Sequence, residues 1–281
     1  MHPVLFHIGS LIVPSYGAVA ALGVLLALGL AQLTARRVMP AGADAEGSAA
    51  VEPRHGWNML VLAVFAALAI SRLLLIVMNL SDLRRHPAWL LSIAMVHHPL
   101  LAAAGVVGAA IAVVIYARWA KLPLRMVGDW LGASVAIGYA AEQMGALLAG
   151  SDYGSYSESR WAVTYTSTLA ARWSGTPLEA PLHPVQAYAA LGALLVAMMC
   201  LLWLRMPRKS GDIGGVWLIG MGSLFFVTEM FRDWEGRGAV LGGIVDIPQL
   251  VGLGMVLLGG AVLVNWRGAR PATVVRENEG N

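Results

Sequence analysis

The sequence predicts an all-α polytopic membrane protein with about seven transmembrane helices, an N-terminus outside the cell and a cytoplasmic C-terminus. Hydrophobic residues make up 58% of the 281 residues and charged residues only 12%, whereas soluble domains have about 25% charged residues. Apolar runs recur along the chain, and a helix of about 20 apolar residues crosses a hydrocarbon core of about 30 Å. Basic residues gather in alternate connections between these runs, which is the pattern that sets membrane orientation.

Seven apolar spans follow one another, at residues 14–35, 57–79, 99–117, 126–149, 184–204, 213–231 and 245–265. We do not expect the first to be a cleaved signal peptide, because no basic region precedes it and no small-residue cleavage site ends it. Twelve of the 19 basic residues lie in the connections after spans one, three, five and seven, and six lie on the opposite side. The positive-inside rule therefore places the first set of connections in the cytoplasm.

The connections differ in character. Residues 38–55 are rich in Ala, Gly and acidic residues, which predicts a solvated cytoplasmic loop. Residues 80–98 include a short apolar turn that is expected along the outer interface. The longest outer loop is 150–183, where the alternating segment WAVTYTST predicts a short strand. We find no internal repeat, so one domain is predicted over 1–266, followed by a polar cytoplasmic tail at 267–281.

Several classes of function are disfavoured. The formal charge of +3 comes from short basic clusters between apolar runs, which indicates topology and a lipid bilayer rather than nucleic acid. The single cysteine, Cys200, lies in an apolar run and is expected to be a packed thiol. His97 and His98 are adjacent in a loop, which is weak evidence for metal. Because no nucleophile elbow, zinc motif, phosphate loop or cysteine cluster is present, no metal and no cofactor are predicted.

Charged groups inside the spans carry more information, since each costs about 2.5–3.5 kcal/mol in hydrocarbon unless it faces a partner or a cavity. Arg72 lies within the second span, and two interpretations stay open: it holds a phosphate, or it pairs with Glu142 or Glu229. Glu142 and Gln143 lie near the outer end of the fourth span. For Glu142, half of a buried ion pair is favoured over a general base.

Other polar groups lie near the ends of spans. Glu229 and Arg232 are three residues apart and share a helix face, so they form a self-satisfied pair or border a lipid pocket. Asp246 is expected to cap the last helix. Asp129 and Trp130 open the fourth span on the inner side, where interfacial anchoring is expected.

A further polar group gathers at the outer boundary. Tyr16 begins the first span, where a tyrosine of the interfacial aromatic belt is the simplest interpretation. The compact turn at 150–154 ends the fourth span. His183 precedes a helix start at Pro184, and it shares a face with Gln186, so the pair has donors for an anionic headgroup.

In order along the chain, HPVLFHIGSLIVPSYG, AGSDYG, WAVTYT, GTPLEAPLHPVQAY and FFVTEMFRDWEGRG resemble the blocks of the prolipoprotein diacylglyceryl transferase family. The resemblance covers residues 1–265. It implies a seven-span enzyme of the bacterial inner membrane. Such enzymes move the diacylglyceryl group of phosphatidylglycerol onto the lipobox cysteine of a prolipoprotein and release glycerol phosphate, so phosphatidylglycerol and a prolipoprotein signal segment are the expected partners.

The resemblance also implies roles for individual residues. The catalytic candidates are Tyr16, Glu229 and Arg232. The substrate-binding candidates are Arg72, Glu142, Gln143, Asp152, Gly154, His183, Gln186 and Tyr188.

Four positions depart from the family pattern. Gln143 and Phe225 stand where the family has arginines, Ala103 replaces a histidine, and Ala189 replaces an acid. Two hypotheses follow: a transferase with reduced or altered activity, or an inactive relative that binds phosphatidylglycerol or lipoprotein signal segments. A small-solute carrier is disfavoured by the odd number of spans and the missing repeat.

Overall fold

The computed structural model describes residues 2–8, 11–38, 54–80, 99–232, 239–240 and 245–265. Seven helices of 18 to 26 residues dominate the described part of the chain. They are α1 (Ser15–Val38), α2 (Arg54–Met78), α5 (Pro99–Trp119), α6 (Leu124–Ala149), α8 (Val185–Trp203), α9 (Asp212–Glu229) and α10 (Ile247–Asn265). Each coincides with one of the seven predicted apolar spans, so these segments are confirmed as helices.

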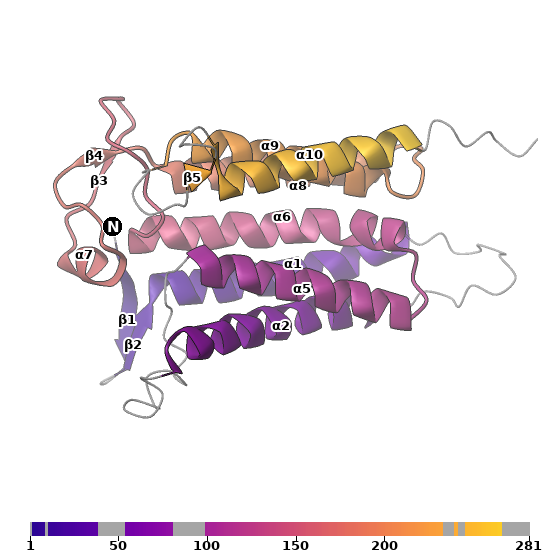
Figure 1. Cartoon of the computed structure of the whole chain (residues 1–281), viewed down its shortest axis with the longest axis horizontal. Helices are drawn as coiled ribbons and strands as arrows, with labels where there is room; N and C mark the ends of the chain where they lie inside the picture. Colours follow the sequence, from indigo (N-terminus) through magenta and orange to yellow (C-terminus); the bar gives the residue numbers. More distant parts are fainter. Residues whose placement is uncertain are drawn as a thin grey trace, which may run out of the picture.

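Short elements gather at one end of the bundle, beside the N-terminus (Figure 1). Three two-stranded antiparallel sheets are described there. Strand β1 (Val4–Ile8) pairs with β2 (Leu11–Pro14), β3 (Val163–Thr164) with β4 (Pro181–Leu182), and β5 (Ala239–Val240) with β6 (Val245–Asp246). Strand β3 lies in WAVTYTST and confirms the predicted strand. The β1–β2 hairpin and the short helix α7 (Thr168–Ser174) were not predicted.

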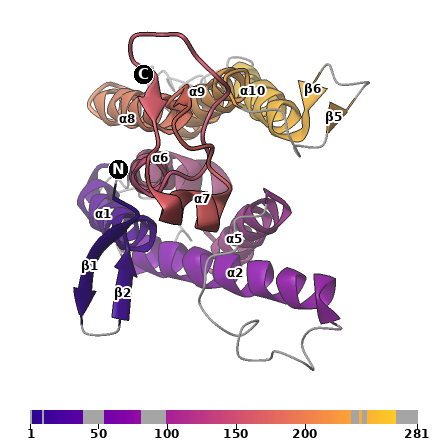
Figure 2. The same ribbon diagram turned by 90° about the vertical axis from the view of Figure 1, so that its left-hand side faces the viewer.

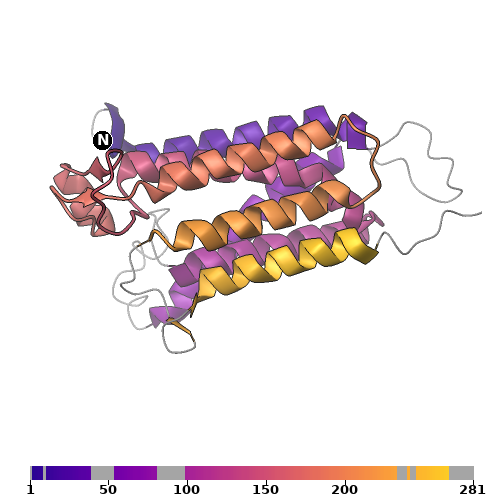
Figure 3. The same cartoon turned by 90° about the horizontal axis from the view of Figure 1, so that it is seen from above.

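Helix α6 lies at the centre of the bundle. It packs against α1, α8 and α9, while α9 also packs against α10, and α2 against α5. The end-on view shows α6 between the row formed by α8, α9 and α10 and the group formed by α1, α2 and α5 (Figure 2). Seen from above, the long helices run side by side along one axis (Figure 3). The central position explains why α6 can carry polar side chains that a lipid-facing helix could not.

Four described helical segments are long and apolar enough to cross a membrane: Ser15–Ala35, Arg54–Met78, Val185–Trp203 and Ile247–Val264. Ala103–Trp119 is a shorter apolar segment. Most of the residues in Arg54–Met78 and Ile247–Val264 are not buried inside the protein, since only 11% of each window is covered. Outward apolar surface of this kind is typical of helices that face lipid.

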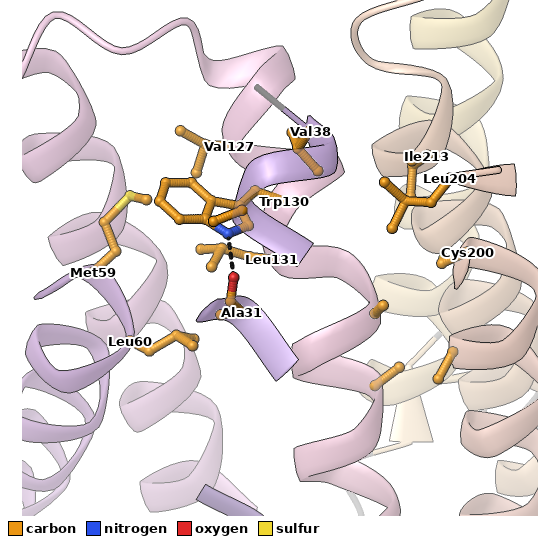
Figure 4. Packing of buried hydrophobic residues seen from close by; sticks show 14 of the residues in the cluster. Ala31, Val38, Met59, Leu60, Val127, Trp130, Leu131, Cys200, Leu204 and Ile213 are labelled. Atoms are coloured by element: carbon orange, nitrogen blue, oxygen red, sulfur yellow. Dashed lines mark hydrogen bonds between the residues drawn. The ribbon is translucent and has the colours of Figure 1, made fainter. Parts of the chain in front are cut away.

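The core surrounds Trp130, whose side chain is fully buried. Its indole N–H donates to the carbonyl oxygen of Ala31 at 2.8 Å, which joins α6 to α1 (Figure 4). Gly56 lies against the indole, because a Cβ there would come within 2.3 Å of the ring. The expectation that Trp130 anchors the protein at the interface was therefore wrong. Cys200 is buried in the same core, as predicted.

Two aspartates cap helices in different ways. Asp246 accepts from the backbone N–H of Gln249 at 3.0 Å, and the Gln249 side chain accepts from the N–H of Asp246 at 3.3 Å. This reciprocal pair is a capping box and confirms the predicted cap. Asp129 is buried, and it accepts from the N–H groups of Gly211 and Gly214 at 2.6 and 2.8 Å. It thus caps α9 from a neighbouring helix instead of serving as an interfacial anchor.

Helices α9 and α10 approach closely where glycines face each other. A Cβ at Gly222 would lie 2.5 Å from the carbonyl oxygen of Gly252, and a Cβ at Gly259 would lie 2.8 Å from that of Gly215. Small residues at such positions let helix backbones pack tightly in membranes. The predicted loop 38–55, the predicted interfacial turn within 80–98 and the tail 267–281 lie wholly or largely outside the described residues.

Candidate functional site

A hydrogen-bonded group joins α1 to α6 at the N-terminal end of the bundle. The Tyr16 hydroxyl donates to Glu142 Oε1 at 2.6 Å, and the Gln143 amide donates to Glu142 Oε2 at 2.7 Å. Gly145 permits this approach, because a Cβ there would lie 3.1 Å from the Tyr16 carbonyl oxygen. Tyr16 is thereby fixed against α6. In the described part of the chain, these two groups are the donors to the Glu142 carboxylate. The ion pair between Arg72 and Glu142, one of the interpretations left open for Arg72, is therefore not formed there.

A second group, of charged side chains, lies where α9 ends. Arg232 Nε is 3.5 Å from Glu229 Oε2, and Arg232 Nη1 is 3.5 Å from Asp152 Oδ1. The predicted pairing of Glu229 with Arg232 is confirmed. Asp152, which follows α6, extends the pair to three members. The Arg232 and Glu229 side chains are 11% and 5% exposed, whereas Asp152 is 42% exposed.

The turn at 150–154 places Asp152 beside Arg232. Gly150 has φ +82° and ends α6 with its N–H on the Ala146 carbonyl at 2.9 Å. The N–H of Gly154 donates to the His183 carbonyl at 3.1 Å, and Gly154 also forms a β-bridge with Arg232. A Cβ at Gly154 would lie 2.6 Å from the His183 carbonyl oxygen, so only glycine fits without a shift. The turn therefore links α6, the start of α8 and the end of α9.

Buried polar side chains support this turn from below. Gln186 is fully buried, and its amide donates to the Ser151 carbonyl and, at 3.1 Å, to the Tyr165 hydroxyl. Burial raises the pKa of the Tyr165 phenol, so it stays protonated. Thr176 donates to the Gly150 carbonyl at 2.6 Å. Gln186 thus orders the turn, and its side chain does not form the shared donor face with His183 that the sequence suggested.

Aromatic rings pack around His183, which precedes α8. His183 Nδ1 is 3.2 Å from the Tyr188 hydroxyl, and the Trp161 indole donates to the same hydroxyl at 2.7 Å. The Phe231 ring packs edge-on against both His183 and Tyr188, with centroid distances of 5.2 and 5.8 Å. Trp161 was missed by sequence reasoning. Its position in the predicted strand gave no indication that its indole would reach Tyr188, 27 residues further along the chain.

Neutral groups occupy the positions where the family pattern has cations. Phe225 packs edge-on against Tyr139 of α6, with ring centroids 5.3 Å apart. Gln143 is 3% exposed, and its Oε1 has no hydrogen-bond partner among the described residues. Tyr139 was also missed, although its spacing of three residues from Glu142 puts both on one face of α6. Among the groups with described contacts, the guanidinium of Arg232 is the cation that meets the carboxylates here.

Two further expectations concern Arg72 and a possible metal site. Arg72 lies half-buried in α2, and its role toward a phosphate stays a prediction. No three His, Cys, Asp or Glu side chains come together as a metal site anywhere in the described ranges. The arrangement itself supports proton transfer through Tyr16 and Glu142 and anion binding through Arg232.

A family model described as "Prolipoprotein diacylglyceryl transferase" matches residues 3–265. A protein of Pseudoalteromonas translucida named phosphatidylglycerol–prolipoprotein diacylglyceryl transferase is 31% identical over 58% of this chain and 57% of its own length.

Relatives with the same name align over nearly the whole length. The Photobacterium profundum protein is 26% identical over 94% of this chain and 92% of its own length. The Clostridium tetani protein is 26% identical over 92% and 95%, respectively. The chain therefore belongs to the prolipoprotein diacylglyceryl transferase family.

Proposed function

We propose that this protein transfers the diacylglyceryl group of phosphatidylglycerol to the lipobox cysteine of a prolipoprotein, more slowly than relatives that carry the full set of cations. Membership of the family over residues 3–265 supports the transferase activity. The observation that carries the proposal is the convergence of two polar groups at one end of the bundle. Tyr16 of α1 donates to Glu142 of α6, and Arg232, three residues after the end of α9, pairs with Glu229 of α9 and with Asp152 of the turn that follows α6.

The chemistry assigns a task to each group. A cysteine thiol has a pKa of about 8.5 and must lose its proton to attack. Glu142, held by Tyr16, accepts that proton, and Tyr16 fixes the carboxylate in position. The sulfur then forms a bond to the terminal glyceryl carbon while the carbon–oxygen bond to phosphate breaks. The electron pair leaves with the phosphate oxygen of glycerol phosphate, whose charge Arg232 offsets.

The remaining candidates bind the substrate in this scheme. His183 and Tyr188 border the headgroup with their rings and polar atoms. Gly154 and Gln186 hold the turn that carries Asp152. Gln143 fixes Glu142, and Arg72 contacts the phosphate from α2.

The same proposal includes a location. The seven long helices cross the inner membrane of a bacterium, with the N-terminus outside and the C-terminus in the cytoplasm. A helix of 18 residues, the shortest of the seven, is about 27 Å long at 1.5 Å per residue, which approaches the hydrocarbon thickness of about 30 Å. The basic residues concentrated in alternate connections support the orientation.

A second candidate function is an inactive relative that binds phosphatidylglycerol or a lipoprotein signal segment. Gln143, Phe225 and Ala103 favour it, because none of them carries a charge or moves a proton. Loss of one catalytic group costs a factor of about 10² to 10⁴, and losses within one functional unit do not simply multiply. A slow enzyme is therefore compatible with these replacements, and so is an inactive one.

Growth of bacteria depleted of their own transferase separates the two candidates. We expect this chain to restore growth partially, Arg232→Gln to abolish the rescue, and Arg205→Gln to retain it. Arg205 is the matched control, since it is exposed beyond the far end of α8. No rescue by the unmodified chain at normal membrane levels, with phosphatidylglycerol still co-purifying, would favour the inactive relative.

A further inference from the structure

The two carboxylates that flank Arg232 differ in how firmly they are held. The Glu229 side chain, at the end of α9, is only 5% exposed, whereas the Asp152 side chain is 42% exposed. A buried carboxylate loses much of its stabilisation if it moves away from its cation. An exposed carboxylate is rehydrated when it moves, so its ion pair contributes only about 0–1 kcal/mol. Asp152 is therefore the exchangeable partner.

The geometry of Arg232 leaves room for such an exchange. Both ion-pair distances are 3.5 Å. A strong charge-assisted hydrogen bond is shorter, at about 2.7–2.9 Å. Arg232 Nε has no hydrogen-bond partner among the described residues. The guanidinium thus has hydrogen-bonding capacity that neither carboxylate uses.

The position of Asp152 is set independently of that ion pair. Its backbone has φ +56°, which is unusual for a residue with a side chain. Gln186 and Thr176 fix the carbonyl groups of Ser151 and Gly150 on one side, and Gly154 is fixed against His183 on the other. The turn therefore holds the Asp152 carboxylate over Arg232 even though the contact between their charged groups is loose.

We propose that Asp152 is a specificity-determining residue that competes with the lipid phosphate for Arg232. The Asp152 carboxylate lies where an anionic oxygen bound to Arg232 Nη1 would lie, so a phosphate must displace it. Anions that bind Arg232 more weakly than Asp152 does are thereby excluded from the guanidinium. Glu229 keeps the guanidinium in place while the exchange occurs. This inference rests on the proposed function only in taking a phospholipid headgroup as the ligand.

Lipid binding to the purified full-length chain tests the proposal without requiring turnover. Nanodiscs with increasing fractions of phosphatidylglycerol in phosphatidylcholine would be titrated, and bound phosphatidylglycerol would be counted by native mass spectrometry after release. We expect Asp152→Asn to tighten phosphatidylglycerol binding about three- to tenfold, which corresponds to the loss of one loose ion pair. Binding of phosphatidylcholine should not change.

Two matched variants make the result specific. Glu158→Gln removes an exposed carboxylate from the same outer loop and should leave the affinity unchanged. Glu229→Gln should weaken phosphatidylglycerol binding, since Arg232 loses its fixed partner. Unchanged or weaker binding in Asp152→Asn, with a thermal unfolding temperature like that of the unmodified chain, would overturn the proposal. Equal tightening in Glu158→Gln would also overturn it, because general electrostatics would then suffice.

The outcome is separable from that of the proposed function. Tighter binding in Asp152→Asn without any transfer activity would support the competition and refute the enzyme. Transfer activity with no effect of Asp152→Asn on affinity would do the reverse.

Discussion

The hydroxyl of Tyr16 is the residue-scale feature on which the proposed chemistry most depends. It donates to Glu142 at 2.6 Å and holds the carboxylate that is to accept a proton. Tyr16→Phe removes this donor and keeps the ring, so we expect transfer to fall about 10²-fold or more while the fold persists. Tyr116→Phe is the control, because that hydroxyl accepts from Asn58 near the opposite end of the bundle. Equal losses in both variants, measured as lipoprotein modification per molecule, would argue against the assignment.

Three neutral residues stand where the family pattern has arginine or histidine, and replacing them should raise the transfer rate. Restoring Gln143→Arg, Phe225→Arg and Ala103→His together should raise transfer about 10-fold or more, since arginine binds phosphate in a bidentate manner and histidine can move a proton. Gln143→Lys in place of Gln143→Arg supplies charge without the bidentate geometry and should recover less. The measurement is the initial rate with purified protein, phosphatidylglycerol and a lipobox peptide. No gain with a stably folded variant would mean that the scaffold lacks more than its cations.

Individual residues also show where sequence reasoning stops. The pairing of Glu229 with Arg232 and the cap at Asp246 were predictable because both partners lie within one helical turn. Gln186 and Trp130 were misinterpreted because their partners, Ser151 and Ala31, are 35 and 99 residues away. Helical spacing shows on which face of a helix a side chain lies, but it does not show which residues pack against that face.

The contact between α9 and α10 shows how a whole element is positioned. Gly222→Ala places a Cβ 2.5 Å from the Gly252 carbonyl oxygen and must push the helices apart. We expect a loss of about 1–3 kcal/mol of stability, the usual cost of overpacking, seen as a lower unfolding temperature in detergent. Gly260→Ala, in the partner helix α10, has no atom within 4 Å of the added Cβ and should be neutral or slightly stabilising. Equal effects of the two substitutions would contradict this packing.

Elements were the most predictable level of this fold. The lengths of the apolar runs alone located all seven long helices in the described part of the chain. A helix that spans a bilayer needs about 20 consecutive apolar residues, so its sequence pattern is easy to recognise. The β1–β2 hairpin and α7 were missed, since they lie at the end of the bundle beside the N-terminus, in segments too short for a clear apolar period. The site is built largely at that end, so its scaffold was less predictable than its helices.

At the scale of the whole molecule, the proposed orientation makes a direct prediction. The chain has a single cysteine, Cys200, which is buried, so new cysteines report their own location. We expect Tyr156→Cys, at a position that is 71% exposed, to react with a membrane-impermeant maleimide in intact cells. Arg205→Cys, near the other end of the bundle, should react only after the cells are opened. The opposite pattern would invert the topology and place the site in the cytoplasm.

The proposed function requires that the two polar groups at the end of the bundle beside the N-terminus perform diacylglyceryl transfer. Mass spectrometry of a reporter prolipoprotein from transferase-depleted cells tests it most directly, with expression of this chain verified in the membrane fraction. The proposal predicts a diacylglyceryl thioether on the lipobox cysteine, present with Arg205→Gln and absent with Arg232→Gln. An unmodified cysteine in cells with abundant, correctly inserted protein would contradict it.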